Sequence, residues 1–156
     1  MKLEKFALLS EIIGSLAVVA TLVVVIVEIR SNTSAVQVTS YQQAIQMLID
    51  QNNTIAMDPE LSQIVAVGLF GRDPQSLNAR DRVRLSVVTE NFFLVFETAF
   101  LSREYGQMNE REWQRWPPII CNIYGIAVGI DLWEGLRGRF TRGFTQFVEA
   151  CPTNDI

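Results

Sequence analysis

The chain has 156 residues, a length typical of one domain. Apolar residues make up 49% of it and charged residues 19%, which is too apolar for a disordered chain and high for an ordinary soluble one. A net charge of −4 argues against nucleic-acid binding, which needs a basic face. The absence of histidine excludes Ser-His-Asp and Cys-His catalysis, HExxH zinc sites and histidine-ligated haem. We therefore expect no enzyme, no cofactor and no metal site.

The first pattern along the chain is an uncharged apolar run, Ile12–Val27. With the preceding Phe6–Leu9 it forms a window of about 22 residues, or about 33 Å of helix, enough to cross a bilayer core of about 30 Å. A cleaved signal peptide would end soon after a small-x-small site, whereas this run continues well beyond Ala17 and Ala20. We predict a retained transmembrane helix rather than a signal peptide or a buried helix of a soluble protein.

One face of this helix carries small and polar side chains at alternating spacings of four and three residues. The predicted helix–helix interface consists of Ser10, Gly14, Ala17 and Thr21, with Glu28 continuing the row. Small residues let membrane helices approach closely, which predicts a homo-oligomer or docking onto a larger membrane complex. The alternative is that small residues are common in any membrane helix.

Charged residues near the two ends bear on depth and orientation. Glu11 lies about one turn inside the apolar window, where it is either an interfacial carboxylate or, with Glu28, part of a charged ring in an oligomeric channel. Lys2 and Lys5 precede the helix and only Arg30 follows it closely. Counted strictly, the positive-inside rule favours a cytoplasmic N-terminus by one charge.

The remainder of the chain is predicted to be helical, so the fold class is all-α. We expect an anchor over residues 1–30 and a small helical bundle over residues 31–156. Ser31–Ser34 is a polar joint, either a break or a turn of one continuous helix. Cap patterns then place helix starts near Asp58, Asn78, Asn109 and Thr141.

The helix that begins after Asn78 is predicted to be central to the bundle because it is apolar on two sides. One face comprises Leu85, Val88, Phe92, Val95, Phe96 and Ala99; the second comprises Val83, Val87, Leu94 and Leu101. Glu90 and Glu97 lie on the second stripe. They could perform acid/base chemistry or bind a cation, but pairing with arginines such as Arg111 or Arg115 is the simpler reading.

Two later features suggest contacts outside the chain. Pro117–Ile130 carries no charge and contains a GxxxG pattern, Gly125 and Gly129, which predicts a buried or partner-facing helix, or a re-entrant segment. Pro117 and Pro118 are expected to interrupt the helix that begins near Asn109. The cluster of Arg137, Arg139 and Arg142 could contact lipid headgroups, or be a solvated face with local ion pairs. Trp113, Trp116 and Trp133 are read as core packing or headgroup contacts.

The residues around the end of the apolar helix resemble a known group. Gly14–Leu22 and the junction Val27–Thr33, which contains Ile-Arg-x-Asn-Thr, resemble the N-terminus of uncharacterised bacterial membrane-anchored helical proteins. Asp58–Leu61, Glu112-Trp113 and Phe144–Val148 fall where that group has recurrent elements. The resemblance implies a single-pass protein of the bacterial inner membrane with a cytoplasmic domain. It implies nothing about activity, because the group has no assigned function. The chain departs from the group in having only Arg30 after the junction.

Three functions follow as expectations. The first is a non-enzymatic membrane anchor that self-associates as a scaffold or serves as an accessory subunit of a larger membrane complex, in contact with lipid. The second is a channel-like oligomer. The third is a small-ligand sensor, with the ligand between the long central helix and Trp113 and Trp116. Cys121 and Cys151 are expected to be free buried thiols in a cytoplasmic domain, and a disulfide between them would argue against that location.

Overall fold

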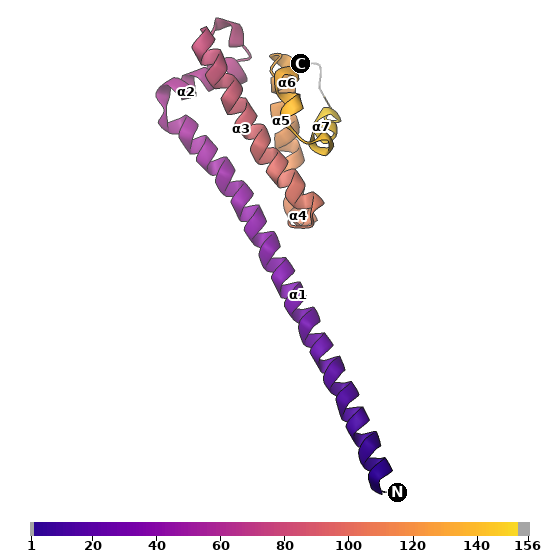
Figure 1. Ribbon diagram of the computed structural model, residues 1–156. Coiled ribbons are helices and arrows are strands. Elements are labelled where there is room, and N and C mark those ends of the chain that lie inside the picture. The colour runs from indigo at the N-terminus through magenta and orange to yellow at the C-terminus, as the bar shows by residue number, and fades with distance from the viewer. Residues whose placement is uncertain (1, 153–156) are drawn as a thin grey trace. The chain divides into compact units, whose positions relative to one another are not determined.

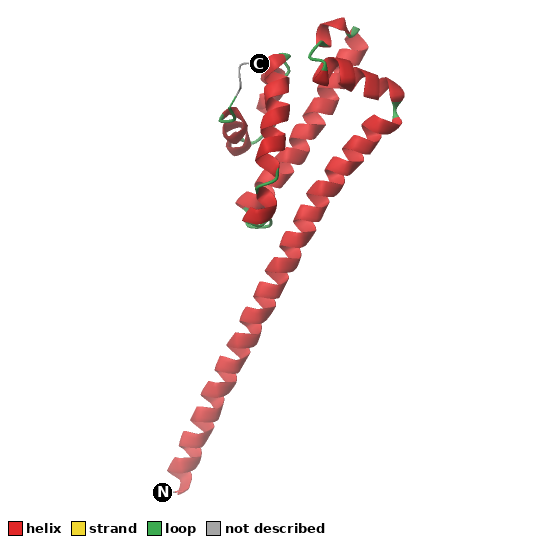
Figure 2. Ribbon diagram, turned by 180° about the vertical axis from the view of Figure 1, so that it is seen from behind, coloured by secondary structure: helices red, strands yellow, loops and turns green. Residues whose placement is uncertain are grey.

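The computed structural model describes the backbone of residues 2–152 and the side chains of residues 14–152. Every regular element in this part of the chain is helical, which confirms the all-α fold class (Figures 1 and 2). The chain divides into two compact units, Met1–Val36 and Gln37–Ile156. The expected boundary after Arg30 does not coincide with a break in the helix, because α1 runs without interruption from Lys2 to Met57.

The first unit consists of the N-terminal part of α1. Every residue from Gly14 to Val36 is exposed, including the large apolar side chains of Leu22 and Ile29 at 57% and 60%. Two helices of the described chain are long and apolar enough to cross a membrane, α1 from Gly14 onward and α3 (Ala79–Glu104), and the bent pair Glu110–Gly129 and Trp133–Arg139 would make a third if it formed one span. None of the α1 window is buried, whereas 56% of the α3 window is. The N-terminal part of α1 is therefore the stronger candidate membrane-spanning helix, since more than half of the α3 window is buried inside the protein.

The second unit begins with the last turns of α1 and continues through short helices around α3. In chain order they are α2 (Pro59–Ile64), a π-helical turn (Val65–Phe70), a 3₁₀ turn (Pro74–Ser76), α3, α4 (Glu110–Trp113), α5 (Trp116–Gly129), α6 (Trp133–Leu136), a 3₁₀ turn (Arg137–Arg139) and α7 (Arg142–Glu149). The C-terminal part of α1 lies antiparallel to α3, because Gln37 donates to the Gly106 carbonyl at 3.1 Å and Gln51 to the Val88 carbonyl at 3.3 Å.

Side-chain caps set the starts of three helices as predicted. The Asp58 carboxylate accepts from the Leu61 amide, the Asn78 side chain from the Asp81 amide and the Asn109 side chain from the Glu112 amide, each at 3.0 Å. Each bond satisfies an amide that a helix start would otherwise leave unpaired. Thr141 also precedes its helix, but without a side-chain cap.

The helix that begins after Asn109 is interrupted near Pro117 and Pro118 as predicted, but the break lies at Gln114 and Arg115, before the prolines. Both prolines lie in the first turn of α5, where a missing amide costs nothing because that amide has no acceptor in the helix. The helix that begins after Asn109 stops at Trp113, and α5 starts afresh at Trp116. The prolines thus initiate a helix instead of breaking one.

An aromatic cluster forms the core of the second unit. Phe93 and Phe96 of α3 are fully buried and contact each other edge to face, with ring centroids 6.0 Å apart. Further aromatic partners come from the segments after α3: Trp113, Trp116, Trp133, Phe140, Phe144 and Phe147. Rings in tilted or edge-to-face contact at these distances stabilise a core beyond their buried area.

The second apolar stripe of α3 is largely exposed, whereas the sequence predicts that it is buried. Val83, Val87 and Leu94 are 64%, 49% and 43% exposed, and only Leu101 is half-buried. The reason is that the later helices pack on the phenylalanine face, while Ala44 is the one buried residue among the described side chains of α1. The domain therefore retains an uncovered apolar strip on its central helix.

Candidate functional site

The predicted interface on α1 is an open face in the structure. Gly14, Ala17, Thr21 and Glu28 are all exposed, while the side chains of Ser10 and Glu11 lie outside the described residues. The Thr21 hydroxyl donates to the Ala17 carbonyl at 2.9 Å, so it satisfies itself within the helix. Such a bond lets threonine occupy an apolar face without an unpaired hydroxyl. Another helix can therefore pack on this face without burying an unpaired Thr21 hydroxyl.

The GxxxG face of α5 is also uncovered by the residues that the structure describes. A Cβ atom added to Gly125 or Gly129 would meet no neighbouring atom within 4 Å. Gly129 is exposed and Gly125 half-buried, and Ile119 and Val128 are 42% and 36% exposed on the same helix. The glycines thus do not serve packing inside this domain.

Two of the three clustered arginines form local ion pairs. Arg137 pairs with Glu134 at 3.3 Å and with Glu149 at 3.2 Å, and Arg139 pairs with Glu90. That bond raises the pKa of the Arg139 guanidinium above its ordinary value. Arg142 is exposed. The reading as a solvated face with ion pairs is confirmed for Arg137 and Arg139, and lipid contact stays a prediction.

The two carboxylates of α3 have structural partners. Besides the Arg139–Glu90 pair, Glu97 accepts the backbone amide of Thr141 at 2.6 Å. The expectation of pairing was right in kind, but the partners come from the segment before α7 and not from Arg111 or Arg115. Together these bonds attach the C-terminal segment to α3.

The two tryptophans beside which a ligand was expected belong to the aromatic core. Trp113 and Trp116 are 4% and 1% exposed and contact Phe100 and Phe96 edge to face, with ring centroids 6.1 and 6.4 Å apart. The interpretation of Trp113 and Trp116 as aromatic core is confirmed by their burial and ring contacts.

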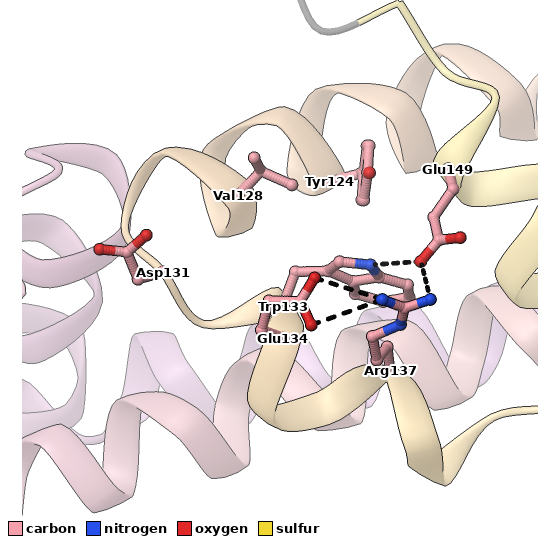
Figure 3. A pocket seen from close by; sticks show the side chains of 7 residues that line it. All are labelled: Tyr124, Val128, Asp131, Trp133, Glu134, Arg137 and Glu149. Atoms are coloured by element: carbon pink, nitrogen blue, oxygen red, sulfur yellow. Dashed lines mark hydrogen bonds and ion pairs between the residues drawn. The ribbon is translucent and has the colours of Figure 1, made fainter.

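A surface pocket of about 370 Å³ lies instead at the C-terminal end of α5 (Figure 3). Its lining comprises Tyr124, Val128, Asp131, Trp133, Glu134, Arg137 and Glu149. The rings of Tyr124 and Trp133 meet at right angles with centroids 5.3 Å apart. The Trp133 indole N–H donates to Glu149 at 3.2 Å, and the same carboxylate oxygen pairs with Arg137. Aromatic walls with a few polar groups are the usual composition of a small-molecule site.

The pocket is acidic. It holds three carboxylates and one guanidinium, a net charge of −2. Tyr124 is only 7% exposed, and burial, followed by the negative charge of Glu149, raises the pKa of its phenol above 10.0. Asp131 follows the end of α5 with a backbone φ of 57°, a conformation that aspartate adopts more readily than most residues.

The expectation of free thiols at Cys121 and Cys151 is wrong. The two sulfurs form a disulfide that links α5 to the chain just after α7, across 30 residues of sequence. Spacing could not reveal this bond, because two cysteines so far apart in sequence meet only once the helices pack. Tyr124 lies one turn after Cys121 and Glu149 two residues before Cys151, so the disulfide joins two walls of the pocket.

Sequence reasoning missed this pocket as a site. Asp131, Glu134 and Glu149 are separated in sequence and carry no motif spacing, and Trp133 reads as core. The available signal was the end of the uncharged α5 segment, where Asp131 and Trp133 follow Gly129 closely. No family model, no curated protein and no solved structure matches this chain.

Proposed function

We propose that this chain is a non-enzymatic, single-pass membrane protein that self-associates through α1 and displays its helical domain at the membrane surface. The observation that carries the proposal is the contrast in burial. From Gly14 to Val36 every side chain is exposed, whereas the domain closes an aromatic core on itself. A lipid bilayer accounts for the exposed apolar length, and the row through Gly14, Ala17 and Thr21 supplies a surface for a second helix.

A second part of the proposal concerns orientation. Disulfides persist in oxidising compartments and are rare in the cytosol, so the Cys121–Cys151 bond favours a domain outside the cytoplasm. Lys2 and Lys5, counted against Arg30, favour a cytoplasmic N-terminus, which is the same orientation. We therefore propose that the domain faces the oxidising side of the membrane, opposite to the placement that the resemblance implies.

Self-association is tested by native mass measurement of the full chain, extracted in mild detergent from the membrane in which it is made. We expect a homo-oligomer that dissociates in Gly14→Leu and Ala17→Leu, because a large side chain on this row prevents close approach. Val19→Leu, on the opposite side of the helix, is the matched control and should leave the mass unchanged. Co-purification with a larger complex at fixed stoichiometry would make the protein an accessory subunit, and a monomer would contradict the proposal.

Orientation is tested separately, with reporters fused after the domain. Alkaline phosphatase is active only where its own disulfides form, whereas green fluorescent protein exported through the general secretion pathway does not fluoresce. We expect an active phosphatase fusion and a dark fluorescent fusion. Alkylation of intact cells followed by non-reducing electrophoresis should show the Cys121–Cys151 bond. The reverse reporter pattern would contradict the proposed orientation and leave the self-association test unaffected.

A further inference from the structure

The last turns of α1, in the second unit, carry two adjacent rows of side chains. One row contacts the rest of the domain and consists of Gln37, Tyr41, Ala44, Leu48, Gln51 and Ile55. Beside it lies a second row, the distal seam, which consists of Val38, Gln42, Ile45, Ile49 and Asn52. Four of these five side chains are exposed and Ile45 is half-buried, so the described part of the domain leaves the distal seam uncovered.

The distal seam lies on an uncharged length of helix. Between Arg30 and Asp50 no residue of α1 is charged, although Val38 and Ile49 are 49% and 45% exposed. The solvent face of a surface helix normally carries charged residues. In a parallel pair of identical helices each side chain faces its own copy, and like charges at that position would repel. The composition of residues 31–49 therefore favours a second copy of this chain over a partner recognised by charge.

The distal seam also keeps the register of the row in the first unit. Val38 and Gln42 lie three heptads after Ala17 and Thr21, and α1 is a single helix from Lys2 to Met57. A repeat of seven residues keeps a pairing seam facing its partner along the whole length of a coiled coil. The spacing therefore continues one helix-pairing pattern from the membrane window into the second unit.

The surface beside the distal seam is already hollowed. A depression of about 470 Å³ on α1 is lined by Thr39, Tyr41, Gln42, Gln43, Ile45 and Gln46. Tyr41 is held there because Arg115 donates to its hydroxyl at 3.2 Å. In coiled coils, a side chain of one helix inserts between four residues of the other. The depression offers such a hole to the side chains of a second helix.

We propose that the distal seam pairs with the distal seam of a second copy of this chain in a parallel coiled coil. This inference rests on the proposed function, because two chains anchored in one membrane in the same orientation present parallel α1 helices. Val38, Ile45 and Ile49 supply the apolar layers of the interface. The amides of Gln42 and Asn52 both donate and accept, so each pairs with its own copy and fixes the register. The interface thus joins the two helical domains as well as the two anchors.

Cross-linking of the full chain, in the membrane in which it is made, tests the pairing. Gln42→Cys and Asn52→Cys place a thiol on the distal seam, and Met47→Cys places one on the opposite, equally exposed side of the helix as the matched control. The native cysteines are joined in a disulfide and do not react with maleimides. With a short bis-maleimide we expect about tenfold more covalent dimer from the two seam variants than from the control, because only seam residues face their own copy.

Equal yields at the three positions, or cross-links to a different protein in place of a second copy, would overturn the proposal. A charge on the seam gives a second test. Ile49→Asp should lower the Gln42→Cys cross-link about tenfold, because two carboxylates then face each other, whereas Met47→Asp should leave it unchanged. Thermal unfolding shows that each variant is folded. Equal cross-linking in the two aspartate variants would also overturn the proposal.

The outcome for the distal seam is separable from the outcome for the proposed function. If the wild type is an oligomer that Gly14→Leu dissociates, while Gln42→Cys cross-links no better than Met47→Cys, then the chains associate in the membrane and the distal seam is not an interface. A wild type of monomeric mass would contradict both proposals.

Discussion

The two long apolar helices of this chain, the N-terminal part of α1 and α3, differ in how much of their apolar surface is buried. Both pass as membrane spans by length and composition, yet α1 buries none of its apolar window and α3 buries 56%. The difference lies in the residue types. The N-terminal part of α1 presents valine, leucine and isoleucine on every side except the row through Gly14, Ala17 and Thr21, whereas α3 concentrates phenylalanine on one face and carries Glu90 and Glu97. Rings gathered on one face can be covered by short helices, and carboxylates need partners that lipid does not offer.

The largest expected effect tests whether α3 is a core helix. Phe96 is fully buried between Phe92, Phe93 and Trp116, so Phe96→Ala should lower the free energy of unfolding of the domain by about 3–5 kcal/mol. Urea unfolding of the full chain in detergent, followed by tryptophan fluorescence, measures it. Leu22→Ala in α1 is the control and should leave the domain transition in place. An equally small effect in both variants would mean that the α3 face is not a protein core.

The next effect concerns the covalent link that only the second unit contains. Removing the 30-residue closure with Cys121→Ser and Cys151→Ser together should cost about 3–4 kcal/mol, because the unfolded chain regains loop entropy. The same measurement on wild-type protein with a reductant should show a comparable loss. Unchanged stability in both cases would mean that the bond restrains neither state of the domain.

A pair of glycines sharpens the contrast between covered and uncovered helix faces. A Cβ at Gly68 would come within 2.6 Å of Leu85 and 2.7 Å of Leu77, and Leu85 is fully buried. Gly68→Ala should therefore destabilise the domain by about 1–3 kcal/mol. Gly125→Ala meets no atom within 4 Å and should stabilise the domain by about 0.5–1 kcal/mol, since alanine favours helix.

The Gly125→Ala variant also tests whether α5 contacts another chain. If Gly125→Ala raises domain stability but lowers the oligomer mass in detergent, the GxxxG face of α5 is an interface between chains. If it raises stability and leaves the mass unchanged, self-association rests on other surfaces. A loss of domain stability in Gly125→Ala would contradict the open α5 face itself.

How much of this could be read from the sequence depends on the range of the interaction. Caps at Asp58, Asn78 and Asn109 act over three residues, and they were predicted correctly. The two prolines of α5 were misread because a proline in the first helical turn and one that ends a helix differ only in what precedes them.

Interactions between segments far apart in the sequence could not be predicted from it. The disulfide, the Arg139–Glu90 pair and the Glu97–Thr141 bond join residues 30 or more positions apart. The pocket depends on the same long-range packing, since Tyr124 and Glu149 share it only because α5 and α7 meet. Apolar periodicity also overstated the burial of Val83 and Val87, because a pattern shows which face is apolar and not whether another helix covers it.

The smallest expected effect lies where α1 ends and α2 begins, at Asp58. Its carboxylate accepts the Leu61 amide and pairs with Arg84 at 2.8 Å. The amide bond, aided by Arg84, lowers the pKa of Asp58 below 3.8, although partial burial acts in the opposite direction. Because the folded-state pKa is the lower one, this stabilisation is complete above the unfolded pKa and is lost as the pH falls through the folded value.

Replacing Asp58 with asparagine isolates that contribution, since asparagine keeps a capping oxygen but cannot titrate. Asp58→Asn should therefore lose less thermal stability than the wild type when the pH falls from about 6 to about 3. The first unit of the chain contains no part of this cap, so its helical circular dichroism should be the same at both pH values. Equal losses in the two proteins would mean that Asp58 holds α2 equally well in both protonation states, and the junction after α1 would then depend on Pro59 and on the packing of Leu61 and Ile64 alone.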